Sequence, residues 1–248
     1  MTERSSRRTG ELDPGKLAIM QEARRIFCVS PHPDDTEFAA GGYVAAMVES
    51  GAKVDLVVVS DGSMGSIDYA DASPLAAKRA EEQEVSAAIL GIGSVTFLGF
   101  RDGDIPAPRE LRGRILDLMR SSTPDLVLTT DPNLPYEAHL DHVNVGRAVM
   151  ESVLLFSHPG IGSGKVRSPR PALALSATAN PNVIFNVDRQ FEKKIRAISA
   201  HRSQMDSSAY ILETVKKASS VFGLQIGTAH GEPFLVLRAE EMHMNVFI

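Results

Sequence analysis

Apolar runs and segments with helical spacing alternate between residues 25 and 155. The apolar runs predict buried strands at residues 25–30, 53–60, 94–98 and 125–130. Small and apolar residues at helical spacing predict helices at residues 38–50, 74–90, 109–120 and 143–155. Strands that alternate with helices in this way are typical of a parallel sheet with helices on both faces.

The pattern changes after residue 156. Gly, Pro and Ser are frequent in residues 157–170, which predicts a loop. Further strands are expected at residues 172–178, 183–187 and 234–237, and helices at 188–201 and 207–221. We therefore expect a Rossmann-like, mostly parallel α/β sheet with helices on both faces and a small C-terminal strand and helix extension.

Neither an internal repeat nor a clear linker divides the chain. Residues 1–15 are polar and predict a solvated tail, so residues 16–248 are expected to form a single domain. The pair Arg7-Arg8 is followed by polar residues instead of the apolar stretch of a secretory signal, which favours a cytoplasmic protein.

Composition excludes several classes of protein. The 248 residues include 26 Lys and Arg against 31 Asp and Glu, and the net charge of −5 argues against a general nucleic-acid binder. The single cysteine, Cys28, excludes an internal disulfide framework. None of the apolar runs is long enough to span a membrane.

Carboxylates and histidines gather where the predicted strands end. In open α/β sheets, ligands bind outside the carboxyl ends of the strands. The first strand is followed by Pro-His-Pro-Asp-Asp at residues 31–35, and the loop after the fourth leads to His-Leu-Asp-His at residues 139–142. Asp61 follows the second strand and Asp102 the third. We expect these groups to share one site.

Two imidazoles and one carboxylate would form a metal site with an open position. His32, Asp35 and His142 have the ligand types of catalytic zinc, and the same set could hold Fe²⁺ or another divalent metal. Asp34 could take a proton from water, and His139 could donate one or stabilise an oxyanion. The alternative is that Asp34 and Asp35 merely cap a helix, and the nearby His-x-Asp-His favours the metal site.

The paired motifs carry a family resemblance. Residues 31–35 together with 139–142 resemble the LmbE-like (PIG-L) family of zinc-dependent N-deacetylases. The turn with Gly62 and Gly65 is similar to a Gly-rich turn of the family, although Ser63 stands where the family often has an acidic residue. Residues 79–91, 95–103 and 200–204 resemble further family segments.

The resemblance implies a role for each matching residue. His32, Asp35 and His142 would be zinc ligands, Asp34 the general base and His139 the acid or oxyanion stabiliser. Asp141 would orient a ligand histidine. Arg79 and Asp102 match positions that hold sugar hydroxyls in the family. Without the resemblance, Arg79 reads as a solvated helix residue and Asp102 as a turn residue.

The spacing of these motifs is similar to one branch of the family, the diacetylchitobiose deacetylases. In that branch a C-terminal histidine from a neighbouring subunit completes the site of a hexamer. His243 is the candidate for this role and His230 the other. The resemblance therefore implies a homo-oligomer, a trimer or hexamer. The alternative is a packing segment with an exposed histidine.

The expected function is hydrolytic removal of the N-acetyl group from an N-acetylglucosamine-type sugar, such as diacetylchitobiose or a conjugate, with release of acetate and the free amine. One alternative is a zinc amidase of the same fold that acts on a thiol conjugate or an acylated natural product. Others are a non-catalytic metal- or sugar-binding protein and a non-hydrolytic Fe²⁺ enzyme. The presence of Asp34 and His139 counts against a pure binder.

Overall fold

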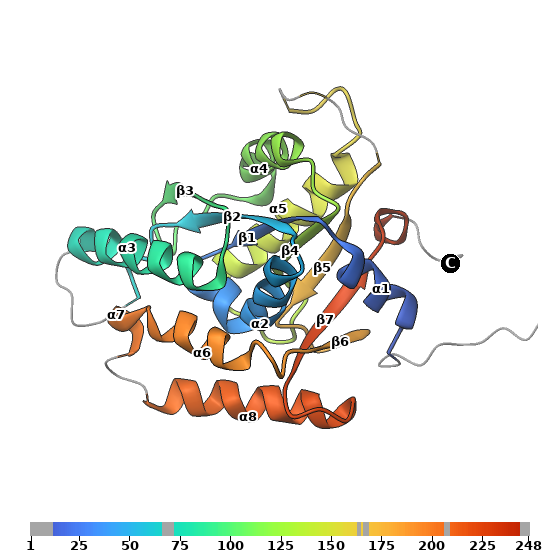
Figure 1. Ribbon diagram of the computed structural model, residues 1–248. Helices are drawn as coiled ribbons and strands as arrows, with labels where there is room; N and C mark the ends of the chain where they lie inside the picture. Colours follow the sequence, from blue (N-terminus) through green and yellow to red (C-terminus); the bar gives the residue numbers. More distant parts are fainter. Residues whose placement is uncertain (1–11, 66–71, 163–164, 166–168, 206–208, 244–248) are drawn as a thin grey trace, which may run out of the picture.

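A computed structural model describes residues 12–65, 72–162, 165, 169–205 and 209–243. Within these residues, one seven-stranded sheet has the order β3-β2-β1-β4-β5-β7-β6 (Figure 1). The strands are β1 (Arg25–Ser30), β2 (Lys53–Ser60), β3 (Ser94–Phe100), β4 (Leu126–Thr130), β5 (Ala172–Ser176), β6 (Val183–Asn186) and β7 (Gly231–Leu237). The first five strands pair in parallel, and β7 runs antiparallel to β5 and β6. The expected mostly parallel α/β sheet is confirmed, and the C-terminal strands extend that same sheet.

Helices cover both faces of the sheet (Figure 1). They are α1 (Pro14–Glu22), α2 (Asp35–Glu49), α3 (Ala72–Leu90), α4 (Pro108–Ser122), α5 (Leu140–Leu155), α6 (Phe191–Ser199), α7 (Arg202–Met205) and α8 (Ala209–Gln225), with a 3₁₀ helix η1 (Ala239–Met242). Helices α4 and α5 lie on one face and α2, α3 and α6 on the other, and α8 packs against β7 and β6 (Figure 1). None of the described helices is both long and apolar enough to cross a membrane.

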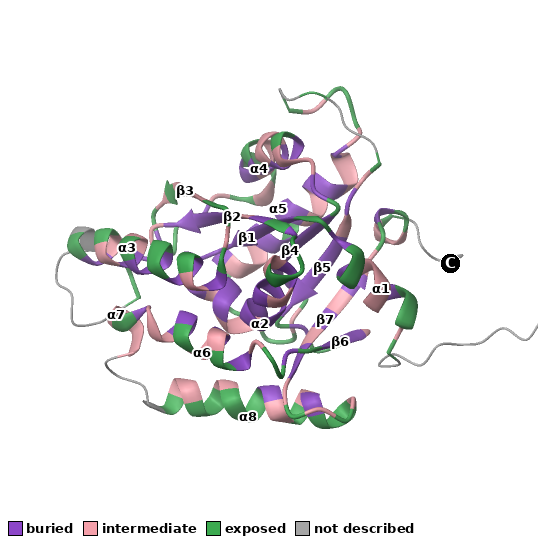
Figure 2. Ribbon diagram, in the orientation of Figure 1, coloured by how far each residue is buried: buried purple, intermediate pink, exposed green. Residues whose placement is uncertain are grey.

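The side chains of β1 alternate between two cores. Ile26 and Cys28 belong to the core shared with α2, whereas Phe27 and Val29 belong to the core shared with α4 and α5. A strand with large apolar residues on both faces is buried on both, as expected for the centre of a parallel sheet. In Figure 2 the central strands are coloured mostly as buried.

Helix α1 was not predicted from the sequence. It begins at Pro14, within the last two residues of the expected tail; residues 1–11 lie outside the described part of the chain. The Asp13 carboxylate accepts hydrogen bonds from the backbone of Gly15 and Lys16, and Pro14 occupies the first turn, where its missing N–H costs nothing. The other expected helices and strands are present with ends shifted by a few residues.

A buried ion pair joins α6 to β7 beneath helix α2. Lys194 Nζ lies 2.6 Å from Glu232 Oε1, and both side chains are almost fully buried. Glu232 also accepts hydrogen bonds from the backbone N–H groups of Gly42 (2.9 Å) and Tyr43 (2.7 Å). Because the carboxylate is satisfied by one ammonium and two amides, the pair ties three elements together.

We expect Lys194→Met to destabilise the fold by about 3–5 kcal/mol, because it leaves the Glu232 charge buried without its cation. Lys193→Met is the matched control. Lys193 pairs with Glu49 near the surface, and its loss should cost less than about 1 kcal/mol. Urea unfolding measures both free energies, and equal losses in the two variants would contradict this account of the buried pair.

Candidate active site

The site lies where the strand order reverses. Strands β2 and β3 extend the sheet on one side of β1, and β4 and β5 on the other, so a crevice opens between β1 and β4 at their carboxyl ends. The loop after β1 carries His32, Asp34 and Asp35. The start of α5, after β4, carries His142. Two segments about 110 residues apart therefore meet at one point, as the strand-end argument predicts.

The loop after β1 has an unusual backbone at Asp34. Its φ of 102° is in the left-handed region, which is costly for a residue with a Cβ. Asp34 occupies the N-cap position of α2, but its side chain makes no capping hydrogen bond, so the interpretation that this carboxylate serves to cap the helix is wrong. Instead, the Asp35 carboxylate turns back and accepts a hydrogen bond from the backbone N–H of His32 (2.8 Å). The Asp35 carboxylate therefore faces the backbone of His32, whereas the Asp34 carboxylate faces Arg79.

Donor atoms of three side chains converge beside this loop. His32 Nδ1 lies 3.2 Å from Asp35 Oδ2 and 3.3 Å from His142 Nε2, and His142 Nε2 lies 3.5 Å from Asp35 Oδ1. A tetrahedral ion with ligand bonds of about 2.0–2.2 Å holds its ligand atoms about 3.3–3.6 Å apart. The trio of His32, Asp35 and His142 therefore fits a zinc-sized ion with a fourth position left for another ligand.

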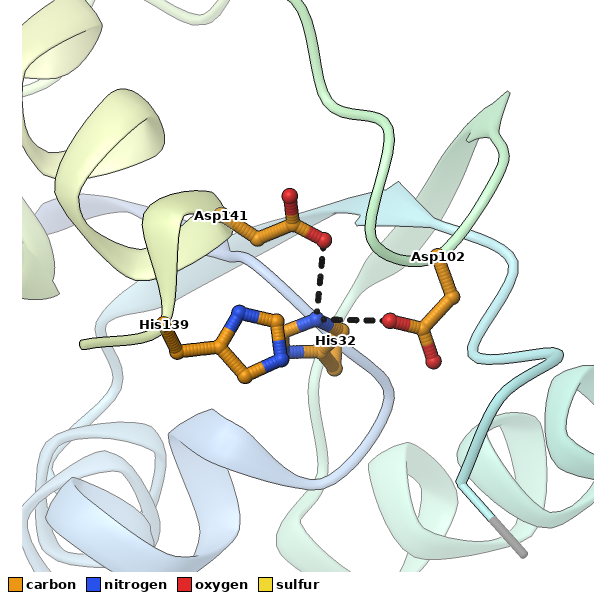
Figure 3. A group of neighbouring side chains, drawn as sticks. All are labelled: His32, Asp102, His139 and Asp141. Carbon is orange, nitrogen blue, oxygen red and sulfur yellow. Dashed lines mark hydrogen bonds and ion pairs between the residues drawn. The ribbon is translucent and has the colours of Figure 1, made fainter.

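The other nitrogen of His32 faces a second group of carboxylates. His32 Nε2 lies 3.2 Å from Asp141 Oδ2 and 3.2 Å from Asp102 Oδ1 (Figure 3). With His139 these residues form a second set that could hold a metal. However, Asp141 accepts hydrogen bonds from the backbone N–H groups of Gly103 (2.8 Å) and Ile105 (3.3 Å). A carboxylate held in this way suits the orienting role expected for Asp141.

The charges around His32 favour a cation at this place. Burial acts to lower the pKa of His32, but hydrogen bonds to Asp102 and Asp35 outweigh it and raise the pKa to about 10. Burial also acts against the charged form of Asp35, yet His32 and His142 hold the pKa of Asp35 below its usual value. A divalent ion would supply the positive charge that a proton on His32 provides here, because metal binding displaces such protons.

Asp34 is held in a buried polar pocket formed by α3. Arg79 Nη2 lies 3.0 Å from Asp34 Oδ2, and the Asp34 backbone N–H donates to Gln83 Oε1 (3.0 Å). Burial raises the pKa of the Asp34 carboxyl to about 7, although the Arg79 guanidinium acts in the opposite direction. A carboxyl whose pKa lies near neutrality suits a group that accepts and returns a proton.

Arg79 is 3% exposed, so its interpretation as a solvated helix residue is wrong. Besides Asp34, its guanidinium donates to the carbonyl oxygens of Gly62 (2.9 Å) and Pro33 (2.6 Å). The Gly-rich turn makes room for it, because a Cβ on Gly65 would lie 2.2 Å from Arg79 Nη1. At φ 65°, Gly62 also adopts a backbone conformation that favours glycine.

An open cleft of about 420 Å³ lies in front of these residues. It is lined by His32, Asp34, Met64, Gly65, Arg79, Asp102, Gly103, His139 and Gln204. His139 is exposed, and its ring stacks on His142 with centroids 5.1 Å apart and lies 4.6 Å from the ring of His32. The cleft thus brings the predicted base, the predicted acid and both predicted sugar-binding residues to one face of the trio.

Asp102 is more than a turn residue. Besides its contact with His32, its Oδ2 accepts a hydrogen bond from the backbone N–H of Met64 (3.1 Å), and the side chain is buried at the wall of the cleft. The interpretation of Asp102 as a simple turn residue is therefore wrong. The role of Asp102 in holding sugar hydroxyls stays a prediction.

The structure places the two C-terminal histidines differently. Strand β7 runs antiparallel to β5, so the segment after its end, which holds exposed His243, lies at the edge of the sheet opposite the trio. His230 lies at the other end of β7, where its ring stacks on Phe191 at 3.6 Å. His243 is therefore not part of the site within one chain.

Sequence reasoning missed several supporting residues. Gln83 holds the backbone of Asp34, and the signal was available because Gln83 follows Arg79 by four residues on the same helix face. Glu137, whose Oε2 lies 3.6 Å from His142 Nδ1, has no such local signal. Asp61, by contrast, was expected at the site because it follows β2, and it accepts a hydrogen bond from the backbone N–H of Asp102 (3.1 Å).

Comparisons with known proteins found a matching family model and several similar deacetylases. The family model described as PIG-L: GlcNAc-PI de-N-acetylase matches residues 27–153. Diacetylchitobiose deacetylase from Thermococcus kodakarensis is 33% identical over 197 residues, covering 77% of this chain and 74% of that protein. A probable N-acetyl-alpha-D-glucosaminyl L-malate deacetylase 2 from Bacillus anthracis is 29% identical over 199 residues, covering 75% and 83%. The solved structure of N,N'-diacetylchitobiose deacetylase from Pyrococcus horikoshii with its inhibitor MPG has a TM-score of 0.86 at 32% identity, covering 92% of this chain and 89% of that one.

Two histidine variants distinguish the trio from the second candidate metal site, which contains His139. His142→Ala removes a donor of the trio and should weaken zinc binding by more than about 100-fold, because even the loss of an orienting partner costs about 10–100-fold. His139→Ala should leave zinc affinity within about threefold. Competition with a zinc-binding dye measures both affinities. Zinc lost from His139→Ala and kept by His142→Ala would assign the ion to the second group.

Proposed function

The chain belongs to the PIG-L family, and from that premise we propose that it hydrolyses the N-acetyl group of an N-acetylglucosamine-type sugar, releasing acetate and the free amine. The observation that carries the proposal is the spacing of the trio, 3.2–3.5 Å between donor atoms, with Asp34 and His139 beside it in one cleft. The deacetylases to which the chain is similar support the substrate class.

We propose Zn²⁺ as the metal, held by His32, Asp35 and His142, while Fe²⁺ or another divalent ion would suit the same donors. When bound, the ion would act as a Lewis acid on the amide carbonyl and acidify the attacking water. Asp141 fixes the other nitrogen of His32, so that the ring presents Nδ1 to the ion. Metal analysis of the purified protein identifies the ion.

We assign the proton transfers to Asp34 and His139. Asp34 would take a proton from water as the water attacks the amide carbon, and its raised pKa would let it return the proton. Arg79 and Gln83 hold Asp34 in the required place. His139, which is exposed and lines the same cleft, would hydrogen-bond the oxygen that gains charge or protonate the leaving amine.

The polar wall of the cleft would hold the sugar. Asp102 lines the cleft with one oxygen directed at His32 and the other at the backbone of Met64. Arg79 lines it as well, and among the described residues its guanidinium donates hydrogen bonds to Asp34, Pro33 and Gly62. We propose that both residues contact sugar hydroxyls, with Arg79 also acting as the support of the base.

We also propose that the chain acts as a homo-oligomer, a trimer or hexamer, in which His243 completes a neighbouring site. The support is the placement of His243, which is exposed and far from its own trio. His230 is the weaker candidate, because its ring is already packed on Phe191.

Asp34→Asn should lower kcat for N-acetylglucosamine or diacetylchitobiose by about 10²–10⁴-fold, because it removes the base and keeps the shape of the side chain. Zinc content should stay unchanged, since Asp34 is not a member of the trio. Acetate release and metal analysis on the same samples measure both effects. The control is Asp104→Asn, an exposed carboxylate paired with Arg101 in a nearby loop, which should keep full activity. Full activity in Asp34→Asn would refute the assignment of the base.

His243→Ala should lower kcat while zinc content and oligomeric state stay as in the wild type. Co-expression of His243→Ala with Asp34→Asn subunits should restore part of the activity, because a mixed oligomer contains sites with both residues intact. Light scattering gives the size of each sample. A fully active His243→Ala protein, or a monomeric wild type, would exclude the shared site.

A further inference from the structure

A second, apolar hollow meets the trio from the other side. This groove, about 300 Å³ in volume, lies between α2, α8 and the start of β7. Its apolar lining includes Phe38, Ala39, Val215, Ala218, Phe222 and Pro233. Two members of the trio, Asp35 and His142, line it as well. The groove is therefore continuous with the proposed metal centre and is not an isolated surface feature.

The two hollows differ in chemistry. The cleft that contains His32, Asp34 and His139 is lined by charged and polar groups, which suit a sugar. The groove that contains Asp35 and His142 is mainly apolar, and Lys194, the one Lys or Arg among its described lining residues, is paired with Glu232 at 2.6 Å. An amide has a polar amine side and an apolar acyl side. If the carbonyl group of the amide lies at the trio, the amine side would occupy the polar cleft and the acyl side would occupy the apolar groove.

We propose that the groove is an acyl-binding subsite and that the enzyme accepts N-acyl amino sugars with chains longer than acetyl. This inference rests on the proposed function. In the reaction, water adds its oxygen to the acyl carbon, the carbon–nitrogen bond breaks, and both protons of the water pass to the leaving nitrogen, which departs as an ammonium group. The products are an alkanoate and the free amino sugar, so no other reactant is needed.

The size of the groove supports this assignment. A space of about 300 Å³ is far more than a single methyl group requires. Burying each further methylene should favour binding by up to about fourfold, and less where the groove is open. Thr130 Oγ1, which also lines the groove, is buried without a hydrogen-bond partner among the described residues, and it could bind an oxygen of the product carboxylate.

The test is a chain-length series. Free amine is measured for N-acetyl-, N-propionyl-, N-butyryl- and N-hexanoyl-glucosamine with wild type, Ala218→Leu and Ala88→Leu. Ala218 is an exposed helix residue at the groove, and Ala88 is an exposed alanine on α3 that serves as the matched control. In wild type and Ala88→Leu, KM should fall about twofold to fourfold per methylene up to butyryl. In Ala218→Leu this gain should disappear while acetyl hydrolysis stays within about twofold.

A binding measurement gives the second readout. Calorimetric titration with acetate, butyrate and hexanoate should show affinity that rises with chain length in wild type and stays flat in Ala218→Leu. A KM that rises steadily beyond acetyl, or equal chain-length profiles in wild type and Ala218→Leu, would overturn the subsite. If none of the amides is cleaved but alkanoate affinity follows the expected pattern, the deacetylase proposal fails and the acyl-binding groove stands. If wild type binds acetate, butyrate and hexanoate with equal affinity, the groove is not an acyl-binding subsite, whether or not the amides are cleaved.

Discussion

Everything in the site depends on the parallel pairing of β1 with β4. The register that sets Ile26 beside Leu126 and Cys28 beside Leu128 brings the two strands to an end at the same edge of the sheet. His32 and His142 then stand with their ring nitrogens 3.3 Å apart, although 109 residues lie between them in the chain. The large buried side chains of β1 on both faces fix this register, because a slip by one residue would exchange the two cores.

Backbone strain at Asp34 is the second constraint, and buried polar groups hold this residue in its strained conformation. A left-handed conformation at an aspartate costs about 1–3 kcal/mol and persists only where its surroundings hold it in place. The surroundings here are the Gln83 amide, which accepts the Asp34 backbone N–H, and Arg79, which reaches both the side chain and the preceding carbonyl. Gln83 is itself held, since its Nε2 donates to Glu37 Oε1 (2.6 Å). Helix α3 thus acts as a support for one residue of the loop after β1.

The trio also divides the space around it. His32 opens onto a polar cleft, whereas Asp35 and His142 open onto an apolar groove under α8. The same carboxylate and imidazole atoms that fit a metal ion therefore separate two regions of opposite polarity. An amide bond positioned at the trio would be oriented by this difference in polarity. Its polar side would favour the cleft, because moving polar groups from water into an apolar space costs free energy.

The sequence by itself determined the order of most strands and helices and the residue types at the strand ends, because periodicity and turn residues act over a few neighbouring positions. It also indicated His32, Asp35 and His142 as one ligand set. Helix α1 was missed, since its start is marked by a single Asp-Pro pair in a polar segment. Only the tertiary structure decided that Arg79 is buried against Asp34, that His243 lies away from its own trio, and that an apolar groove reaches Asp35. These features depend on how distant elements pack, and pairwise contacts across long sequence separations leave no local pattern.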